Sequence, residues 1–240
     1  MTQKDARGLA MTGADAAAAE RYETALSQFQ CYVGDPVATL EAALAERPDF
    51  AMALVFKAYL FLAGTEAAGL PVAAEAAATL KALPLNDREG RHLAAIEALQ
   101  AGQWERAVER LEELLIAFPR DILAQQIAHL YDFYRGDWRS LRDRVARRLQ
   151  AYAPQDTGYG AMLAMQAFGL EEAGDYGRAE DFGRRAVELN ERDGWAYHAV
   201  AHVLEMRNDP EGGIAWLEPS SPKWSPDSFF DVHNWWHLAL

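Results

Sequence analysis

Two pairs of histidines near the end of the chain have a spacing that could do chemistry. His198 and His202 are four residues apart. His233 and His237 have the same spacing and follow the first pair by 35 residues. On a helix, side chains four residues apart lie on one face, with Cβ atoms roughly 5–6 Å apart. Glu205 extends the first face by one turn, so the sequence predicts four imidazoles and a carboxylate on two neighbouring helices.

Three interpretations of this cluster stay open. In the first, the histidines, Glu205, Trp195 and Asn234 line a groove and offer hydrogen bonds and stacking to a ligand or peptide. In the second, the two pairs bind a transition metal such as Zn²⁺ or Fe²⁺, which accepts imidazoles from adjacent helices. In the third, the imidazoles bond to one another and to backbone carbonyls in a buried polar seam. The cluster lacks the His-Glu-x-x-His pattern of a hydrolytic zinc helix, whereas the equivalent placement of the two pairs favours a metal.

The two remaining histidines lie in helices of the same kind. His92 comes ten residues before Gly102, and His129 comes seven residues before Gly136. We therefore add both to the candidate groove and predict no catalytic residue. The complete set of candidate binding residues is His92, His129, Trp195, His198, His202, Glu205, His233, Asn234 and His237.

The composition excludes several classes of protein. The chain has 240 residues, half of them hydrophobic, and a formal net charge of −13. Such an acidic chain is repelled by nucleic acid and by anionic lipid, so we expect neither as a partner. A single cysteine, Cys31, cannot form an internal disulfide and fits a reducing compartment. No signal peptide and no apolar run long enough for a membrane span are visible, so we expect a cytoplasmic protein.

A repeated turn divides the chain into helix pairs. Each turn is followed by an amphipathic stretch and preceded by another, and prolines at three of the turns suit the first position of a helix. Successive turns are 33 to 38 residues apart. They are Gly34-Asp35-Pro36, Gly69-Leu70-Pro71, Gly102-Gln103-Trp104, Gly136-Asp137-Trp138, Gly174-Asp175-Tyr176 and the degenerate Asn208-Asp209-Pro210. The 46 alanines supply small side chains where paired helices must approach closely.

These features resemble the tetratricopeptide repeat superfamily. The period near 34 residues matches, as do the small residues Ala107 and Ala179 five positions after a turn glycine and Pro119 at the end of a unit. The resemblance implies an all-α fold, a right-handed α-solenoid of helix-turn-helix units. We expect a flexible tail over residues 1–16, then six units and the first helix of a seventh over residues 17–240. The resemblance also implies that the first helix of each unit lines a concave groove.

The last third resembles more narrowly the N-terminal half of the tetratricopeptide repeat protein 38-like family. The resemblance rests on the His-rich helices His198-Ala-Val-Ala-His202-Val-Leu-Glu205 and His233-Asn234-Trp235-Trp236-His237. Members of that family are about twice as long, so we expect the sequence to be part of a longer protein. A solenoid normally ends in a polar capping helix. The apolar end from Phe229 to Leu240 therefore predicts self-association.

The sequence favours a non-enzymatic scaffold whose His-rich groove receives a peptide, a protein partner or a small ligand. No cofactor is expected in that case. The alternative is a metal-binding protein or metal-dependent enzyme that uses the His198/His202 and His233/His237 pairs.

Overall fold

The part of the chain that the structure describes is mostly helical. The computed structural model describes residues 3–240, which form α-helices and one short 3-10 helix without a β-strand. This confirms the predicted all-α fold of helix-turn-helix repeats. None of the described helices is both long and apolar enough to cross a membrane.

The helices group into two compact units, which we describe separately. The first unit comprises the chain up to Leu26 and Asp35–Arg135, and the second comprises Ser27–Gly34 and Gly136–Leu240. The boundary falls in the turn that follows the seventh helix. The last residues of the first helix thus belong to the second unit, together with the C-terminal helices.

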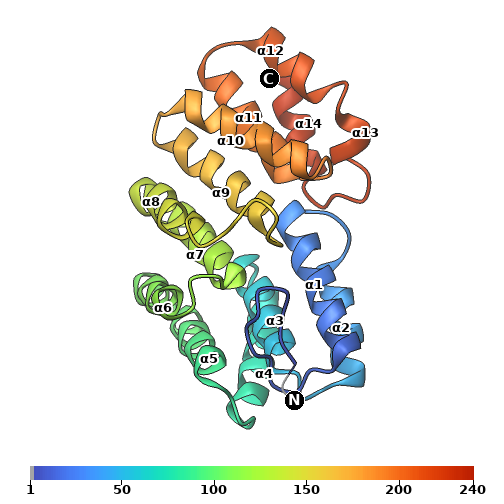
Figure 1. Cartoon of the computed structure of the whole chain (residues 1–240), viewed down its shortest axis with the longest axis vertical. Helices are drawn as coiled ribbons and strands as arrows, with labels where there is room; N and C mark the ends of the chain where they lie inside the picture. Colours follow the sequence, from blue (N-terminus) through green and yellow to red (C-terminus); the bar gives the residue numbers. More distant parts are fainter. Residues whose placement is uncertain (1–2) are drawn as a thin grey trace. The chain divides into compact units, whose positions relative to one another are not determined.

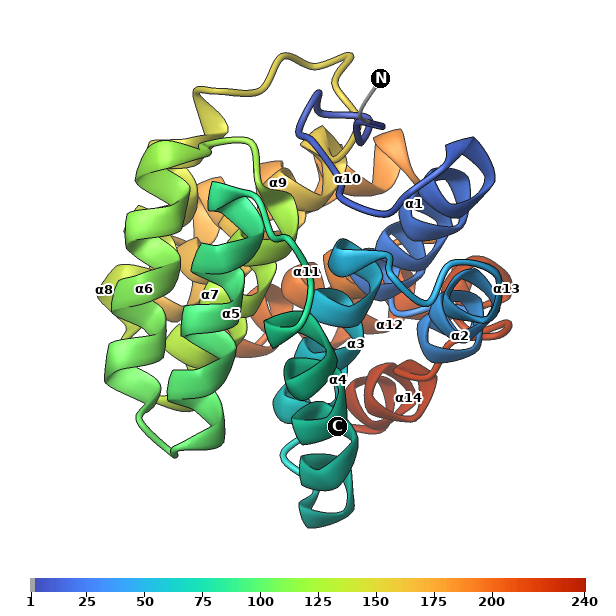
Figure 2. The same cartoon turned by 90° about the horizontal axis from the view of Figure 1, so that it is seen from below.

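The first unit is built from antiparallel helix pairs. Asp35 caps the N-terminus of α2, Asn86 and Glu89 form a reciprocal capping box at α5, and Asp121 caps α7. Figure 2 shows α5 and α6 running side by side, as their packing requires. The elements are α1 (Ala16–Cys31), α2 (Pro36–Glu46), α3 (Ala51–Ala63), η1 (Ala67–Gly69), α4 (Leu70–Lys81), α5 (Asp87–Gln100), α6 (Trp104–Ala117) and α7 (Ile122–Tyr134).

The second unit continues the pattern and ends in a single helix. In Figure 1 the helices α9, α10 and α11 follow one another, and α11 also packs against α12 and α14. Because α14 follows a complete pair, it occupies the place of a first helix. The elements are α8 (Trp138–Leu149), α9 (Tyr159–Glu172), α10 (Tyr176–Leu189), α11 (Gly194–Met206), α12 (Pro210–Leu217), α13 (Ser221–Trp224) and α14 (Asp231–Ala239).

The N-terminal segment differs from the expected flexible tail. Residues 1 and 2 lie outside the described residues, but Asp5, Arg7 and Met11 are buried. The backbone N–H of Thr12 donates to the Glu89 carboxylate at 2.7 Å. The segment is thus held in the first unit by buried charges and by an apolar side chain. Sequence patterns within helices carry no information about such contacts.

The end of α1 fixes the loop that leads into α14. Tyr32 has a positive φ of 59°, so the chain leaves the helix sharply. The Tyr32 carbonyl accepts hydrogen bonds from the Phe229 N–H at 3.1 Å and from the Ser228 hydroxyl at 2.9 Å. The Gly34 N–H donates to the Asp227 carbonyl at 2.7 Å. These bonds set where α14 begins and therefore which of its side chains face α11.

Gly169 allows α8 and α9 to approach closely in the second unit. A Cβ atom at this position would lie 2.8 Å from the Arg142 Cα and 2.8 Å from the Leu141 carbonyl oxygen. Both are backbone atoms, which cannot turn away as a flexible side chain could. The contact thus requires a residue without a side chain.

We expect Gly169→Ala to destabilise the second unit by about 1–3 kcal/mol, because the added methyl group overpacks a rigid contact. The matched control is Gly177→Ala in α10, where a Cβ atom would meet nothing within 4 Å. That control should be neutral or slightly stabilising, since alanine favours helices. Urea unfolding of both variants measures the difference, and equal stabilities would contradict this account of the α8–α9 contact.

Candidate functional site

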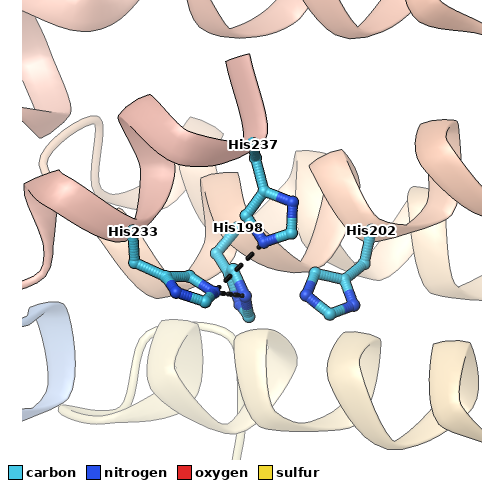
Figure 3. A group of neighbouring side chains, drawn as sticks. All are labelled: His198, His202, His233 and His237. Atoms are coloured by element: carbon cyan, nitrogen blue, oxygen red, sulfur yellow. Dashed lines mark hydrogen bonds between the residues drawn. The ribbon is translucent and has the colours of Figure 1, made fainter. Parts of the chain in front are cut away.

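The four histidines of the two pairs meet between α11 and α14. Figure 3 shows His198 and His202 projecting from α11 toward His233 and His237 on α14. Their ring centroids lie 4.2 Å apart for His198 and His202, and 4.8 Å apart for His198 and His233. One ring nitrogen from each of the four lies within 4.8 Å of the others. The structure therefore brings together residues that the sequence placed one repeat apart.

Three of these imidazoles point the same nitrogen at one another. The Nε2 atom of His233 is 3.0 Å from Nε2 of His198 and 3.1 Å from Nε2 of His237. An imidazole nitrogen carries either one proton or one lone pair. If Nε2 of His233 carries a proton, that proton is shared between two acceptors. If it carries a lone pair and His237 is protonated on Nδ1, this lone pair faces the lone pair on Nε2 of His237. Hydrogen bonding alone therefore satisfies at most one of the two contacts fully.

A carboxylate orients His237. The Nδ1 atom of His237 lies 3.0 Å from Oε2 of Glu205. When Nδ1–H donates to this carboxylate, Nε2 keeps its lone pair and turns it toward His233. A carboxylate bonded to the far nitrogen of an imidazole is the usual partner of a metal-binding histidine. Glu205, which we predicted to lie beside the histidines, thus contacts Nδ1 of His237.

His202, the fourth histidine, lies beside the other three (Figure 3) and faces α9. Its Nδ1 atom lies 3.5 Å from Oε2 of Glu171, a buried residue near the end of α9. The exposed neighbour Glu172 completes a second group with Glu171 and His202, in which one possible ligand atom from each residue lies within 4.8 Å of the others. His202 thus belongs to two adjoining groups of possible ligands.

The protein environment keeps the central imidazoles neutral. Burial, reinforced by the neighbouring His202, lowers the pKa of His237 to about 4, although Glu205 acts in the opposite direction. Burial also lowers the pKa of His198 well below its usual value, and the pKa of His233 is lowered for the same reason. Neutral imidazoles offer lone pairs at neutral pH, so a cation would not have to displace protons.

Aromatic rings surround the buried side of the cluster. Phe168 stacks on His198 with ring centroids 5.6 Å apart, and Trp195 lies 4.7 Å from the same imidazole. Trp195 stacks in turn on Tyr32 at 5.2 Å. Since Trp195 is buried, it supports His198 instead of lining an open groove. These aromatic rings contribute to the burial that lowers the pKa of His198.

Asn234 has a structural role in the same place. Its side chain is fully buried and donates from Nδ2 to the Gly194 carbonyl at 3.1 Å. It is the buried residue of α14. The predicted groove residue therefore joins α14 to the start of α11 instead of facing a ligand.

His92 and His129 do not line a groove, contrary to our prediction. Both are buried in the first unit, with 0% and 2% of their surfaces exposed. His92 Nε2 lies 2.9 Å from the Asp121 carboxylate, and His92 Nδ1 lies 3.1 Å from the Tyr59 hydroxyl. His92 has the same offset from its turn as His198, but its neighbours are Asp121 and Tyr59 instead of other histidines.

Arg88 completes the buried network around Asp121. Its Nε donates to Asp121 Oδ2 at 2.6 Å, and its Nη1 lies 3.2 Å from Asp5. Burial by itself raises the pKa of Asp121, but Arg88 and His92 outweigh it and hold this pKa well below the usual value. His92 thus belongs to a closed structural network.

We expect Asp121→Asn to destabilise the first unit by about 3–5 kcal/mol, because the buried Arg88 guanidinium loses the closer of its two carboxylate partners. Asp35→Asn is the matched control, since both aspartates cap a helix and Asp35 is exposed. The control should change stability by less than about 0.5 kcal/mol, because asparagine also caps helices.

The same pair of variants tests the charge. Because the pKa of Asp121 is depressed in the folded chain, its stabilisation is complete above the unfolded value of about 3.9 and is lost as pH falls below it. Urea unfolding should therefore show the gap between wild type and Asp121→Asn narrowing below about pH 4. A gap that stays constant with pH would contradict the ionic role of Asp121.

Sequence reasoning missed Glu171 and Glu172. A signal for Glu171 was present, because it lies three residues before Gly174, as Glu205 lies three residues before Asn208. Glu171 and Glu205 therefore occupy equivalent positions on consecutive first helices. Both also interrupt otherwise apolar stretches.

Comparison with known proteins places the fold among helical repeats. No family model matches the chain. A chain in the crystal structure of the APC/C hetero-tetramer Cut9-Hcn1 superposes with a TM-score of 0.59 and 18% identity over 85% of this chain. This chain spans only 38% of that protein's length. A tetratricopeptide repeat protein from Parabacteroides merdae ATCC 43184 matches with a TM-score of 0.50 and 16% identity, over 88% of this chain and 82% of its own. These likenesses show that the chain has the helical-repeat fold of tetratricopeptide repeat proteins.

Proposed function

We propose that this chain is a metal-binding helical-repeat protein. A divalent transition-metal ion is held by the Nε2 atoms of His198, His233 and His237. The observation that carries the proposal is the meeting of these three nitrogens at 3.0 and 3.1 Å, where one proton cannot serve both contacts. A cation in their midst would accept all three lone pairs at once.

The distances support a shared ion. Zinc binds histidine nitrogen at about 2.0–2.1 Å, so two nitrogens on one ion are separated by about 2.9–3.4 Å, depending on whether the geometry is octahedral or tetrahedral. The two observed separations lie in this range. Imidazole ligands suit Zn²⁺, Fe²⁺, Cu²⁺ and Ni²⁺. Glu205 fixes the orientation of His237 and so completes the support of the site.

A partner-binding role is the second candidate function, and the exposed side chains of α14 favour it. The Cut9-Hcn1 assembly, which has a related fold, is a hetero-tetramer. By analogy with it, this chain would act as a non-enzymatic scaffold for a protein, a peptide or a small ligand. The exposed rim of the cluster, at His233 and the half-exposed Glu205, would contact the ligand.

Two further assignments remain proposals. The His-rich helices are similar to those of the tetratricopeptide repeat protein 38-like family, and we propose that relationship for the second unit. The single cysteine, Cys31, is buried, and a chain with one cysteine fits the reducing compartment that we propose, the cytoplasm.

We expect the purified chain, freed of any histidine tag and stripped of metal, to bind Co²⁺ with the visible absorption of a nitrogen-rich site. His233→Ala should abolish this absorption, because it removes the nitrogen that both other imidazoles approach. Because His233 also contacts His198 across the α11–α14 contact, the variant must be shown to fold as the wild type does. Visible titration and circular dichroism on the same samples check binding and folding.

Val232→Ala is the matched control, since it is an exposed neighbour on the same helix. It should bind Co²⁺ as the wild type does. If the wild-type chain shows no Co²⁺ absorption, or if His233→Ala keeps it, the proposed metal site is absent.

The outer face of α14 also predicts self-association. Val232, Trp236 and Leu240 are 79%, 52% and 65% exposed, and such a concentration of apolar surface favours contacts between molecules. We expect sedimentation to depend on concentration and Val232→Asp to weaken this dependence. Ile116→Asp, at a similarly exposed site in the first unit, is the control. A monomer at all concentrations would contradict the prediction.

A further inference from the structure

A second group of possible ligands adjoins the three imidazoles. We infer that Glu171, Glu172 and His202 hold a second divalent cation, so that the C-terminal unit carries a two-metal site. This inference rests on the proposed function, in which the first ion is bound by the other three histidines. The second position differs from the first in chemistry, because it combines two carboxylates with one imidazole.

The placement of the three residues follows from the packing of α9 against α11. Glu171 and Glu172 end α9, and His202 lies on the side of α11 that faces it. One oxygen from each carboxylate and one nitrogen of His202 lie within 4.8 Å of one another. Three donors from two rigid helices are thus already gathered around a small volume.

The contact between Glu171 and His202 is too long for a good hydrogen bond. The Oε2 and Nδ1 atoms are 3.5 Å apart, whereas a charge-assisted N–H···O bond is about 2.7–2.9 Å long. Two ligands bound at about 2.1 Å to one tetrahedral ion lie about 3.4 Å from each other. The observed separation is close to that of two ligands on one ion.

The buried carboxylate of Glu171 also supports a cation at this position. Its side chain is 5% exposed, and its buried Oε2 atom accepts no hydrogen bond within residues 3–240. In the same described part of the chain, no lysine or arginine forms an ion pair with Glu171 or Glu172. A buried carboxylate without such partners is costly, and a divalent cation between the two carboxylates would compensate for the charge.

His202 is free to serve this second position. It makes no hydrogen bond to the other three imidazoles within the described residues, although its ring lies 4.6 Å from that of His237. Figure 3 shows it at one side of the group, with its ring directed toward α9. The geometry thus separates one histidine from the three that share their Nε2 contacts.

The donor atoms indicate which ions each position prefers. Carboxylate oxygens suit Mn²⁺, and imidazole nitrogens suit Zn²⁺ and Fe²⁺. The mixed position should accept Mn²⁺, Fe²⁺ or Zn²⁺, whereas the all-nitrogen position should discriminate against Mn²⁺. Zinc is therefore the probe that fills both positions.

The test counts zinc ions bound per chain. Metal-free protein without a histidine tag is dialysed against Zn²⁺ and analysed by mass spectrometry of the elements. The wild type should hold two ions, and Glu172→Gln should hold one while keeping the Co²⁺ absorption of the all-nitrogen position. Glu172 is exposed, so this change does not disturb packing. Glu188→Gln, an exposed glutamate of the same unit, is the matched control and should hold two.

Four results would overturn the inference. One zinc per chain in the wild type contradicts the second position and leaves the first intact. Two zinc ions in Glu172→Gln show that this carboxylate is no ligand. If Glu171→Gln weakens zinc binding about 10–100-fold without changing the count, Glu171 only orients a histidine. Absence of any zinc would overturn the proposed function as well.

Discussion

The contact of His198 with His233 determines how α14 lies on α11. The two Nε2 atoms approach to 3.0 Å, and Asn234 is the buried residue of this last helix. Most apolar side chains of α14 point outward, so little hydrophobic burial holds the helix in place. Its position depends on polar contacts and on the loop that the Tyr32 carbonyl fixes. The formation of the site and the docking of α14 are therefore one event.

Two histidine–carboxylate networks in this chain differ in how the charge of the buried carboxylate is compensated. In the first unit, His92 and Asp121 are buried together with Arg88, whose guanidinium compensates the carboxylate. That network is closed, because each charge already has a partner. In the second unit, Glu171 is buried beside His202 and has no lysine or arginine partner in the described residues. The missing positive charge is what distinguishes a candidate ion site from a structural network.

The repeats and the histidine pairs could be predicted because both follow local rules. The turn at Gly174-Asp175 and the cap of α12 at Asp209 are set by a few adjacent residues. The spacing of four within each pair fixes a helix face, and the offset of one repeat makes the two faces equivalent. These regularities suffice to gather His198, His202, His233 and His237.

The remaining features depend on contacts between distant residues. The Ser228 hydroxyl meets the Tyr32 carbonyl across 196 positions of sequence, and the N-terminal segment bonds to Glu89 across 77. No helical periodicity encodes either contact. His92 was assigned to a groove because its offset resembled that of His198, but Asp121 and Tyr59 draw it into the interior. The partners of each imidazole thus distinguish histidines that spacing alone treats as alike.

Diffraction from crystals grown with Zn²⁺, collected on both sides of the zinc absorption edge, tests the central claim most directly. The account predicts an anomalous peak about 2.0–2.1 Å from the Nε2 atoms of His198, His233 and His237, with the Glu205 carboxylate bonded to the far nitrogen of His237. A map without a peak between α11 and α14, with the imidazoles in the same positions, would contradict it.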